Sequence, residues 1–315
     1  MKKICYWSPH ISHVATIKNV INSAISVKKF AKNDIDVKIL DVVGEWSEFK
    51  QTLDSNDIKI LKFSNLRLTK FLPITGFLKS RIIYFLIFFL KINQLKNILK
   101  KEKPNFLIIH LITFVPLFLL IFFKFQTKFI LRISGLPKYT ILRKFFWKLI
   151  SKKVYLVTCP SSQTRDDLVR LNIFPKEKLE ILYDPILNIK KISEDIIKNN
   201  NYNKKIYLLN IGRLTKQKNQ ILLIKAFSEI LKKSKDLCLY IVGDGEEKKN
   251  LKNYINSNDL QKNIFLCGYL KNVYPIIKNC DALISSSLWE DPGAVMIEAS
   301  YCGKNIISSN CPNGP

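Results

Sequence analysis

Strand-like and helix-like segments alternate along most of the 315-residue chain. Short apolar runs such as "KKICYW", "DVKILDVV" and "NFLIIH" precede longer stretches in which apolar residues recur at helical spacing. Alternation of this kind is typical of βαβ units, in which helices connect parallel strands and cover both faces of the sheet. The sequence therefore predicts an α/β protein built on parallel sheets.

The alternation is interrupted once, by a polar segment rich in Asn and Lys that precedes "KIYLLNIG". Such a composition is typical of a linker. We therefore expect a Rossmann-like domain over residues 1–185, a linker over 186–204 and a second Rossmann-like domain over 205–315. Two such domains, joined by a linker, would face each other across a cleft. In open α/β sheets ligands bind outside the carboxyl ends of the strands, so a ligand is expected in that cleft.

The chain is strongly basic, with 51 Lys and Arg against 25 Asp and Glu, and a formal net charge of +26 at pH 7. The basic residues are spread over the whole length, so they form no single terminal block. A field of this sign attracts anionic lipid headgroups, lipid phosphates and nucleic acid. We find no nucleic-acid-binding module and no aromatic-basic motif, so nucleic acid is the weakest of these candidates.

Two apolar segments raise the question of a membrane span. The run over 82–90 lies between basic residues and is much shorter than the roughly twenty residues that a spanning helix needs. The run over 106–123 contains His110 and Pro116, and it divides into a strand and a helix. The apolar run at the N-terminus, Ile4–Trp7, is too short for the core of a signal peptide. We therefore expect a cytoplasmic protein without a membrane span.

The segment "SSLWEDPGAVMIEASYCGK", residues 286–304, carries clear helix boundary signals. Asp291 can cap the helix, Pro292 suits its first position and Gly303 suits its end. Gly293 and Ala294 are small residues at its start, so the backbone N–H groups there are open to an anion that the helix dipole favours. The sequence predicts an anion site at this helix start.

Two glutamates flank that predicted anion site. Glu290 lies just before the helix and Glu298 lies on its second turn. Carboxylates accept hydrogen bonds from sugar hydroxyls, so the pattern suits a ligand that carries both phosphates and hydroxyls. The alternative is that both are ordinary charges near a helix start, each worth roughly 0.3–1 kcal/mol.

A second cationic element occurs in "NIGRLTKQKN", residues 210–219. A strand is expected to end at Gly212, and Arg213 and Lys218 follow on the connecting loop. Arg supplies a planar fork and Lys a point charge, which suits a pyrophosphate leaving group when no metal is bound. No metal-binding motif is evident in the sequence. His10 and His13 have metal-like spacing, but no third ligand is identifiable.

These motifs, together with "LYIVGDGEEKKNL" and "CPNGP", resemble the consecutive motifs of the nucleotide-binding domain of family 4 retaining glycosyltransferases. The resemblance covers about residues 205 to 315, and the N-terminal half is similar in style to enzymes of bacterial capsule or lipopolysaccharide assembly. It implies the two-domain GT-B fold and a metal-independent, cofactor-free reaction. A sugar would pass with retention from a nucleotide-diphosphate sugar to a lipid-linked, lipopolysaccharide or capsule acceptor, at the inner face of the cell membrane.

The resemblance also implies a role for each candidate site residue. It places the donor pyrophosphate on Arg213 and Lys218 beside Gly212, the transferred sugar on Glu290, the phosphate on the amides of Gly293 and Ala294, and the ribose hydroxyls on Glu298. His110 matches a family histidine at the sugar end of the cleft, although a hydrogen-bonded core histidine is an equal alternative. Tyr269 lies either near the base or in packing.

Some features depart from the family pattern. Where many members carry a Gly-Gly pair after the first strand, this sequence has Ser8-Pro9-His10, and it ends at Pro315, earlier than family members usually do. A non-catalytic or degenerate truncated fragment is therefore the alternative hypothesis. For Arg132, Ser134 and Gly135, contact with the acceptor and a structural turn are equal alternatives. The helix from Leu78 to about Lys100, with the basic charge, predicts contact with an anionic membrane.

Overall fold

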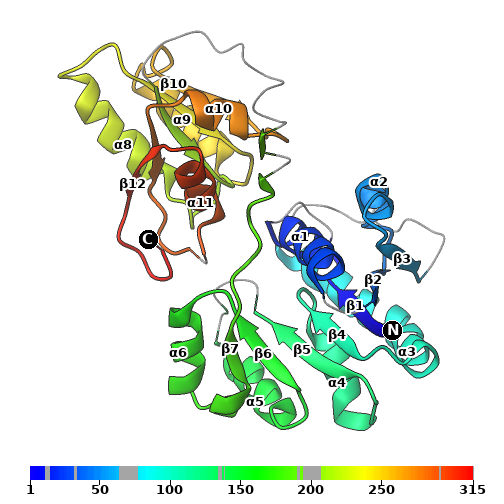
Figure 1. Cartoon of the computed structure of the whole chain (residues 1–315). Helices are drawn as coiled ribbons and strands as arrows, with labels where there is room; N and C mark the ends of the chain where they lie inside the picture. Colours follow the sequence, from blue (N-terminus) through cyan, green and yellow to red (C-terminus); the bar gives the residue numbers. More distant parts are fainter. Residues whose placement is uncertain are drawn as a thin grey trace. The chain divides into compact units, whose positions relative to one another are not determined.

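The computed structural model describes residues 1–10, 15–31, 34–63, 77–133, 137, 139–189, 192–193, 207–290 and 292–314, with the backbone alone for residues 15 and 77–83. The chain divides into two compact units, Met1–Pro185 and Ile186–Pro315 (Figure 1). The first unit therefore ends at Pro185, and the second unit includes the segment 186–204. Within the segment expected to be a linker, Ile192 is 1% exposed and packs in the core of the second unit together with Leu187.

Unit 1 is built on a seven-stranded sheet with the order β3-β2-β1-β4-β5-β6-β7, and each neighbouring pair is parallel. The direction of chain progression reverses between β1 and β4, so the loops after these two strands lie at the topological switch point. The strands are β1 (Lys2–Trp7), β2 (Ile35–Asp41), β3 (Lys59–Lys62), β4 (Phe106–Ile109), β5 (Lys128–Arg132), β6 (Leu156–Cys159) and β7 (Leu179–Ile181).

The two faces of this sheet have separate apolar cores. One core joins α1 to β1 and β2, and the other joins α3, α4, α5 and α6 to the strands. Thr140 and Ser161 cap α5 and α6, because each hydroxyl accepts a hydrogen bond from the N–H three residues later. The helices are α1 (Ala15–Phe30), η1 (Ser47–Phe49), α2 (Lys50–Asp54), α3 (Phe77–Glu102), α4 (Phe114–Phe122), α5 (Ile141–Ile150), α6 (Ser162–Arg170) and η3 (Lys176–Lys178).

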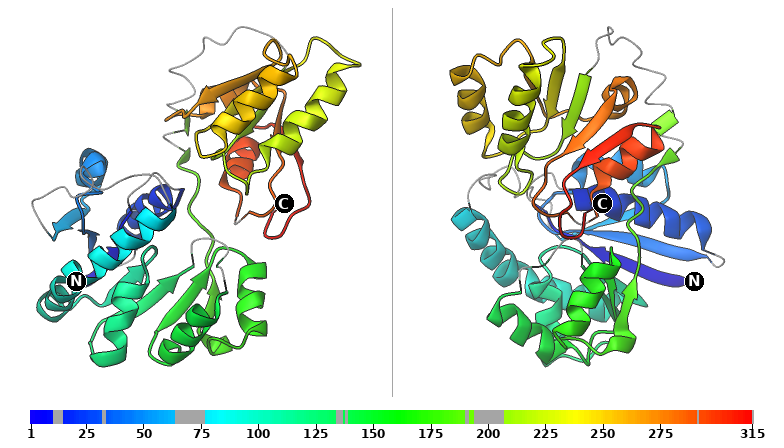
Figure 2. Two further views of the ribbon diagram at one scale, coloured as in Figure 1. Left: turned by 180° about the vertical axis from the view of Figure 1, so that it is seen from behind. Right: turned by 90° about the vertical axis from the view of Figure 1, so that its left-hand side faces the viewer.

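Unit 2 is built on a five-stranded parallel sheet with the order β10-β9-β8-β11-β12, and helices cover both of its faces (Figure 2). Leu223, Ile224 and Phe227 of α8 pack in one core, and Ile277, Met296 and Ala299 pack in the other. The elements are β8 (Tyr207–Ile211), α8 (Gln220–Leu231), β9 (Cys238–Val242), α9 (Lys248–Ser257), β10 (Ile264–Gly268), α10 (Tyr274–Asn279), β11 (Ala282–Ser285), α11 (Ala294–Tyr301) and β12 (Asn305–Ser308).

The long apolar segments fold as predicted. Residues 106–123 include the strand β4 and the helix α4, and Val115, Leu117 and Leu119 of α4 pack in the core. Among the described residues, no helix combines the length and the apolar composition that crossing a bilayer requires.

Candidate functional site

The candidate site of unit 2 lies at the carboxyl ends of β8 and β11. These neighbouring strands run parallel, with Leu208 opposite Ala282, so the loops that follow them meet at the same edge of the sheet. The first loop carries Arg213 and Lys218, and the second carries Glu290. The topology thus brings together two segments that lie more than seventy residues apart in the sequence.

Lys218 and Glu290 form an ion pair, with 2.5 Å between Nζ and Oε1. The same oxygen accepts a hydrogen bond of 2.6 Å from the Ser287 hydroxyl. The Glu290 side chain is only 7% exposed, so these two donors offset the unfavourable burial of a carboxylate. The structure therefore brings the predicted cation and the predicted acid into direct contact.

Hydrogen bonds fasten the two loops to each other. The N–H of Leu288 donates to the Gln217 carbonyl at 2.8 Å, and the Gln217 side-chain amide donates to the Trp289 carbonyl at 2.9 Å. The Ser286 hydroxyl donates to the Lys218 carbonyl at 2.9 Å. Sequence reasoning did not single out Gln217 or the serines, although the run "SSS" after a strand offered a signal, because Ser side chains bond readily to nearby backbone groups.

Glycines allow close backbone approach beneath this edge. Gly243 has φ +148°, and a Cβ there would lie 1.9 Å from the Gly212 carbonyl oxygen. Gly212 in turn lies against the aliphatic stem of Lys218, since a Cβ at position 212 would be 3.3 Å from its Cδ and Cε. Gly212 therefore contributes to the site by leaving room for the lysine stem.

Arg213 is exposed on the same loop as Lys218. Its carbonyl accepts a hydrogen bond of 3.1 Å from the buried side chain of Gln220, which fixes the backbone of the loop. The guanidinium is thus accessible at the sheet edge, where an anionic ligand would find it. Its role in binding pyrophosphate stays a prediction.

The start of α11 differs from the expectation. The helix begins at Ala294, and Gly293 is its N-cap, in the left-handed conformation with φ +70°. Pro292 therefore precedes the cap and does not occupy the first helical position, while the predicted cap Asp291 lies outside the described residues. The reason is that only Gly293 readily adopts this backbone turn, and a Cβ there would lie 2.3 Å from Met296 Cε.

The environment of Glu298 also differs from the expected one. The resemblance places the ribose hydroxyls on this carboxylate, whereas the structure buries it. It is 5% exposed, and its Oε1 accepts a hydrogen bond of 2.9 Å from the Tyr274 hydroxyl, which is itself buried. The carboxylate thus lies against Tyr274, the first residue of α10. Glu290 is buried too, but it lies at the sheet edge beside a cation. A contact between Glu298 and ribose stays a prediction.

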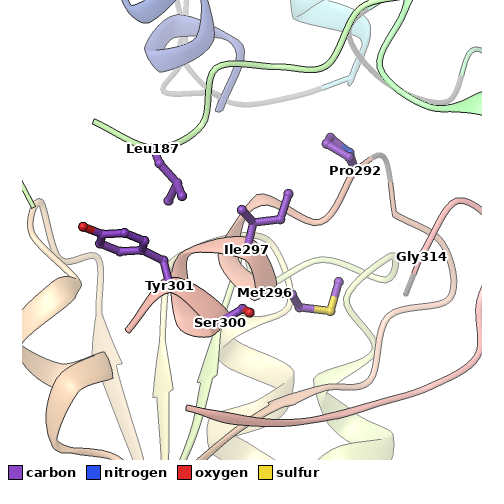
Figure 3. A pocket seen from close by; sticks show the side chains of 7 residues that line it. All are labelled: Leu187, Pro292, Met296, Ile297, Ser300, Tyr301 and Gly314. Atoms are coloured by element: carbon purple, nitrogen blue, oxygen red, sulfur yellow. The ribbon is translucent and has the colours of Figure 1, made fainter. Parts of the chain in front are cut away.

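A shallow pocket of about 470 Å³ lies on another side of α11 (Figure 3). None of the predicted site residues lines it, and its lining carries no charged side chain. We therefore do not assign the anion site to this pocket. The lining residues are Leu187, Pro292, Met296, Ile297, Ser300, Tyr301 and Gly314.

In unit 1, His110 follows β4 at the switch point of the sheet. Its backbone N–H donates to the Trp7 carbonyl at 2.9 Å, and its ring stacks on Tyr6 with 6.2 Å between centroids. Burial, with a smaller contribution from the charge of Arg132, lowers the pKa of His110 to about 3. The imidazole is therefore neutral at physiological pH, and a role at the sugar stays a prediction.

The remaining candidate residues of the two units lie in different environments. Arg132 is buried and pairs with Asp184 at 2.5 Å, which favours the structural alternative for this residue. Ser134, Gly135 and His13 lie outside the described residues. His10 packs edge-on against Trp46, and Tyr269 is 61% exposed after β10. Among the described residues, no three His, Cys, Asp or Glu side chains cluster as metal ligands; the metal-independent reaction stays a prediction.

Comparison with known proteins identifies the family. Residues 191–315 match the glycosyl transferases group 1 family. The chain is 31% identical to an uncharacterized glycosyltransferase of Methanocaldococcus jannaschii over 249 residues, which cover 70% of this chain and 59% of that protein. It is 30% identical to an N-acetylgalactosamine-N,N'-diacetylbacillosaminyl-diphospho-undecaprenol 4-alpha-N-acetylgalactosaminyltransferase of Campylobacter jejuni, over 56% of this chain and 47% of that one.

The fold agrees with that identification. The crystal structure of Anabaena HepE in complex with UDP-glucose superposes with a TM-score of 0.68 at 16% identity, over 99% of this chain and 82% of that one. Residues 191–315 thus form a glycosyl transferases group 1 domain, and the chain has the GT-B fold. It spans about half the length of the curated relatives it matches.

Proposed function

We propose that the chain transfers a sugar from a nucleotide-diphosphate sugar to a lipid-linked glycan, lipopolysaccharide or capsule acceptor, with retention of anomeric configuration and without a metal. The observation that carries this proposal is the Lys218–Glu290 pair at the carboxyl edge of the unit 2 sheet, within the matched family domain. It combines a cation for phosphate with an acid for sugar hydroxyls.

In the proposed reaction, the bond between the anomeric carbon and the phosphate oxygen of the donor breaks. The nucleotide diphosphate leaves with additional negative charge, which Lys218 and the exposed Arg213 stabilise. The acceptor oxygen bonds to the same carbon on the same face, and its proton passes to the leaving phosphate oxygen. The N–H groups at Gly293 and Ala294 bind phosphate, because the first N–H groups of a helix lack intrahelical partners.

The two glutamates recognise different ends of the donor in this proposal. Glu290, already oriented by Lys218 and Ser287, accepts a hydrogen bond from a hydroxyl of the transferred sugar. Glu298 accepts from the ribose, which requires it to exchange its hydrogen bond with Tyr274 for one with the ligand. His110, neutral because of its low pKa, hydrogen-bonds the sugar without adding charge, and Tyr269 lies near the base.

The acceptor is proposed from similarity and charge. The Campylobacter relative is named for an acceptor carried on diphospho-undecaprenol, which is a membrane lipid. The net charge of +26 favours an anionic surface of the same kind. We therefore propose that the protein acts peripherally at the inner face of the cell membrane.

The test is a transfer assay with the purified chain, a panel of nucleotide sugars and polyprenyl-diphosphate-linked acceptors, in the presence and absence of a chelator. We expect transfer that resists chelation, with an anomeric proton coupling in the product that matches the donor. Glu290→Gln should abolish it, whereas Glu229→Gln, at an exposed position on α8, should not.

Two outcomes would favour the alternatives. Nucleotide-sugar binding without transfer to any acceptor would favour the non-catalytic, degenerate fragment. Binding of nucleic acid with a steep salt dependence, without any binding of nucleotide sugars, would favour the nucleic-acid-binding reading.

A further inference from the structure

Unit 1 exposes an unusual amount of apolar surface on α3, α4 and α5. Soluble proteins rarely expose contiguous apolar patches of more than a few hundred Å², and larger patches mark interaction sites. On α5 alone, Ile141 is 86% and Leu142 83% exposed. The exposed large apolar residues of the three helices are Tyr84, Phe85, Leu86, Phe89, Leu90, Phe114, Phe122, Ile141, Leu142, Phe145 and Leu149.

Aromatic contacts join the three helices into one layer of unit 1 (Figure 1). The ring of Phe88 on α3 lies 5.2 Å from that of Phe114 and 5.0 Å from that of Phe118, both on α4. Phe114 lies 4.9 Å from Phe146 on α5. The three helices thus pack side by side, and we call them, with the exposed residues that they carry, the α3–α5 layer.

The same stretch of chain is almost free of acids. Residues 77–153 contain 16 Lys and Arg and a single acid, Glu102, which pairs with Lys38 at 2.6 Å. Lys96 lies 4.0 Å from the ring centroid of Phe123, and Lys152 is exposed just beyond the end of α5. Aromatic and aliphatic residues beside lysines are the composition of helices that lie in a membrane interface.

The helix α5 shows the pattern most clearly. Its exposed apolar residues, Ile141, Leu142, Phe145 and Leu149, recur at helical spacing and so share one face. Trp147 and Ile150 face the core instead. Because burial of Trp147 and Ile150 already anchors the helix, its exposed apolar stripe is not needed for folding.

We propose that the α3–α5 layer docks on an anionic lipid bilayer, with the exposed stripe of α5 inserted among the acyl chains and the lysines against lipid phosphates. This inference rests on the proposed action at a membrane and specifies the surface that achieves it. A bilayer matches both the apolar and the basic side chains. A second copy of the chain would instead bring two surfaces of like charge together.

Docking in this way would suit the proposed acceptor. α4 begins with the exposed Phe114 just after His110, and α5 begins after the loop that follows β5. Both helix starts therefore lie at the carboxyl edge of the unit 1 sheet. The bilayer would contact the edge at which the loops of an open α/β sheet take their ligands, so a lipid-linked acceptor could reach that edge while its lipid stays in the membrane.

Vesicle flotation of the whole chain tests the proposal. The variant replaces three exposed residues of α5, as Ile141→Ser, Leu142→Ser and Phe145→Ser; the control replaces two exposed residues of α8, as Leu222→Ser and Ile230→Ser. We expect the wild type and the control to bind phosphatidylglycerol-containing vesicles. The affinity of the α5 variant for these vesicles should be lower by a factor of at least about ten. Vesicles of phosphatidylcholine alone should bind all three poorly.

Three results would overturn the proposal. The first is that the α5 variant binds the anionic vesicles as well as the wild type does, and the second is that the wild type does not bind them. The third is that the chain forms a concentration-dependent dimer that only the α5 variant abolishes. Binding of a panel of nucleotide sugars in solution, measured on the same samples, separates this inference from the proposed function. Vesicle binding without any nucleotide-sugar binding would contradict the function alone, while unchanged sugar binding by the α5 variant shows that unit 2 is folded.

Discussion

The carboxyl edges of the two sheets differ in the groups that they expose, although both units are parallel sheets with connecting helices. In unit 2 the edge carries the Lys218–Glu290 pair and the exposed Arg213. In unit 1 the corresponding groups are buried: a neutral His110 stacks on Tyr6, His10 packs against Trp46, and Arg132 pairs with Asp184. The architecture fixes where the loops meet, and the loop residues alone decide what each edge binds.

The difference extends to how the two edges are held. The unit 2 loops are fastened by hydrogen bonds and by glycines that let backbones approach closely. The unit 1 edge combines ring packing with buried polar contacts, among them the Arg132–Asp184 pair and the N–H groups of Val42 and Val43 that donate to the Glu45 carboxylate. Substitutions of charged residues in unit 2 should therefore lower the rate of transfer. In unit 1 the free energy of unfolding should depend on pH.

Apart from the loss of transfer in Glu290→Gln, the largest effect should follow from Lys218→Ala. It removes the cation that we propose binds the leaving diphosphate, and within the described part of the chain it leaves Ser287 as the remaining partner of the buried Glu290 carboxylate. We expect kcat/KM for the nucleotide sugar to fall by about 10³-fold, or about 4 kcal/mol. The measurement is steady-state transfer.

Lys216→Ala is the matched control, because Lys216 is exposed on the same loop. It should leave kcat/KM nearly unchanged. Equal losses in the two variants would show that the loop contributes only general positive charge, and the special position of Lys218 would be refuted.

Gly243→Ala should destabilise unit 2 and spare unit 1. The added Cβ would lie 1.9 Å from the Gly212 carbonyl oxygen, and φ +148° is itself unfavourable for alanine. We expect a loss of about 3 kcal/mol in the free energy of unfolding of unit 2. Amide hydrogen exchange resolves the units, because only β8 and β9 and their neighbours should lose protection.

Gly303→Ala provides the control for backbone strain. Gly303 has φ +71°, but a Cβ there would have no neighbouring atom within 4 Å. It should cost only about 1 kcal/mol. Similar losses for the two variants would mean that the close approach of Gly243 to Gly212 contributes nothing to unit 2.

The sequence predicted the elements that form continuous apolar runs. The strands β1, β2 and β4 and the helix α4 follow directly from such runs, and α11 follows from its boundary signals. The elements α2, β3, α6 and β7 were not predicted. They contribute few apolar residues and take their structure from packing against elements that the pattern does show.

The candidate site was predictable where it depends on loop positions in a parallel sheet. Lys218 and Glu290 follow neighbouring strands, so their meeting could be expected from topology. The Tyr274–Glu298 hydrogen bond could not, because it depends on how α10 packs beside α11 and no local pattern encodes that angle. The late start of α11 at Ala294 depends on the left-handed turn at Gly293, which competes with the usual cap signals.

His110 should contribute a smaller pH response of defined sign to unit 1. The pKa of His110 is about 3 in the folded state, below its ordinary value of 6.5, so between these values the unfolded chain binds a proton that the folded chain does not. The His110 contribution to stability is therefore intact above pH 6.5 and falls as the pH decreases toward 3, by about 2 kcal/mol at pH 5. Burial raises the pKa of Glu45, which shifts stability in the opposite direction, so a His110 variant is needed to isolate the histidine.

His110→Gln tests whether His110 causes this loss of stability in acid, because the glutamine side chain does not titrate. Denaturant unfolding of the wild type and the variant at pH 7.5 and at pH 5 should show that the variant loses about 2 kcal/mol less over this interval. Lys216→Ala again serves as the control and should follow the wild type. Parallel losses in wild type and His110→Gln would mean that acid sensitivity arises elsewhere.

The smallest effect should follow from Tyr274→Phe. This variant tests whether Glu298 binds the ribose or serves only as a structural partner of Tyr274. The variant removes the hydroxyl that donates to the buried carboxylate, so unit 2 should lose about 1 kcal/mol of stability. If the ribose has to displace that hydroxyl, its removal also removes a competitor, and nucleotide-sugar affinity should rise by about threefold, measured by calorimetry. Tyr301→Phe, half-exposed on α11, should change neither quantity. A fall in affinity that tracks the loss of stability would instead make Glu298 a structural partner of Tyr274, and the charged edge of unit 2 would then depend on Glu290 alone for its acid.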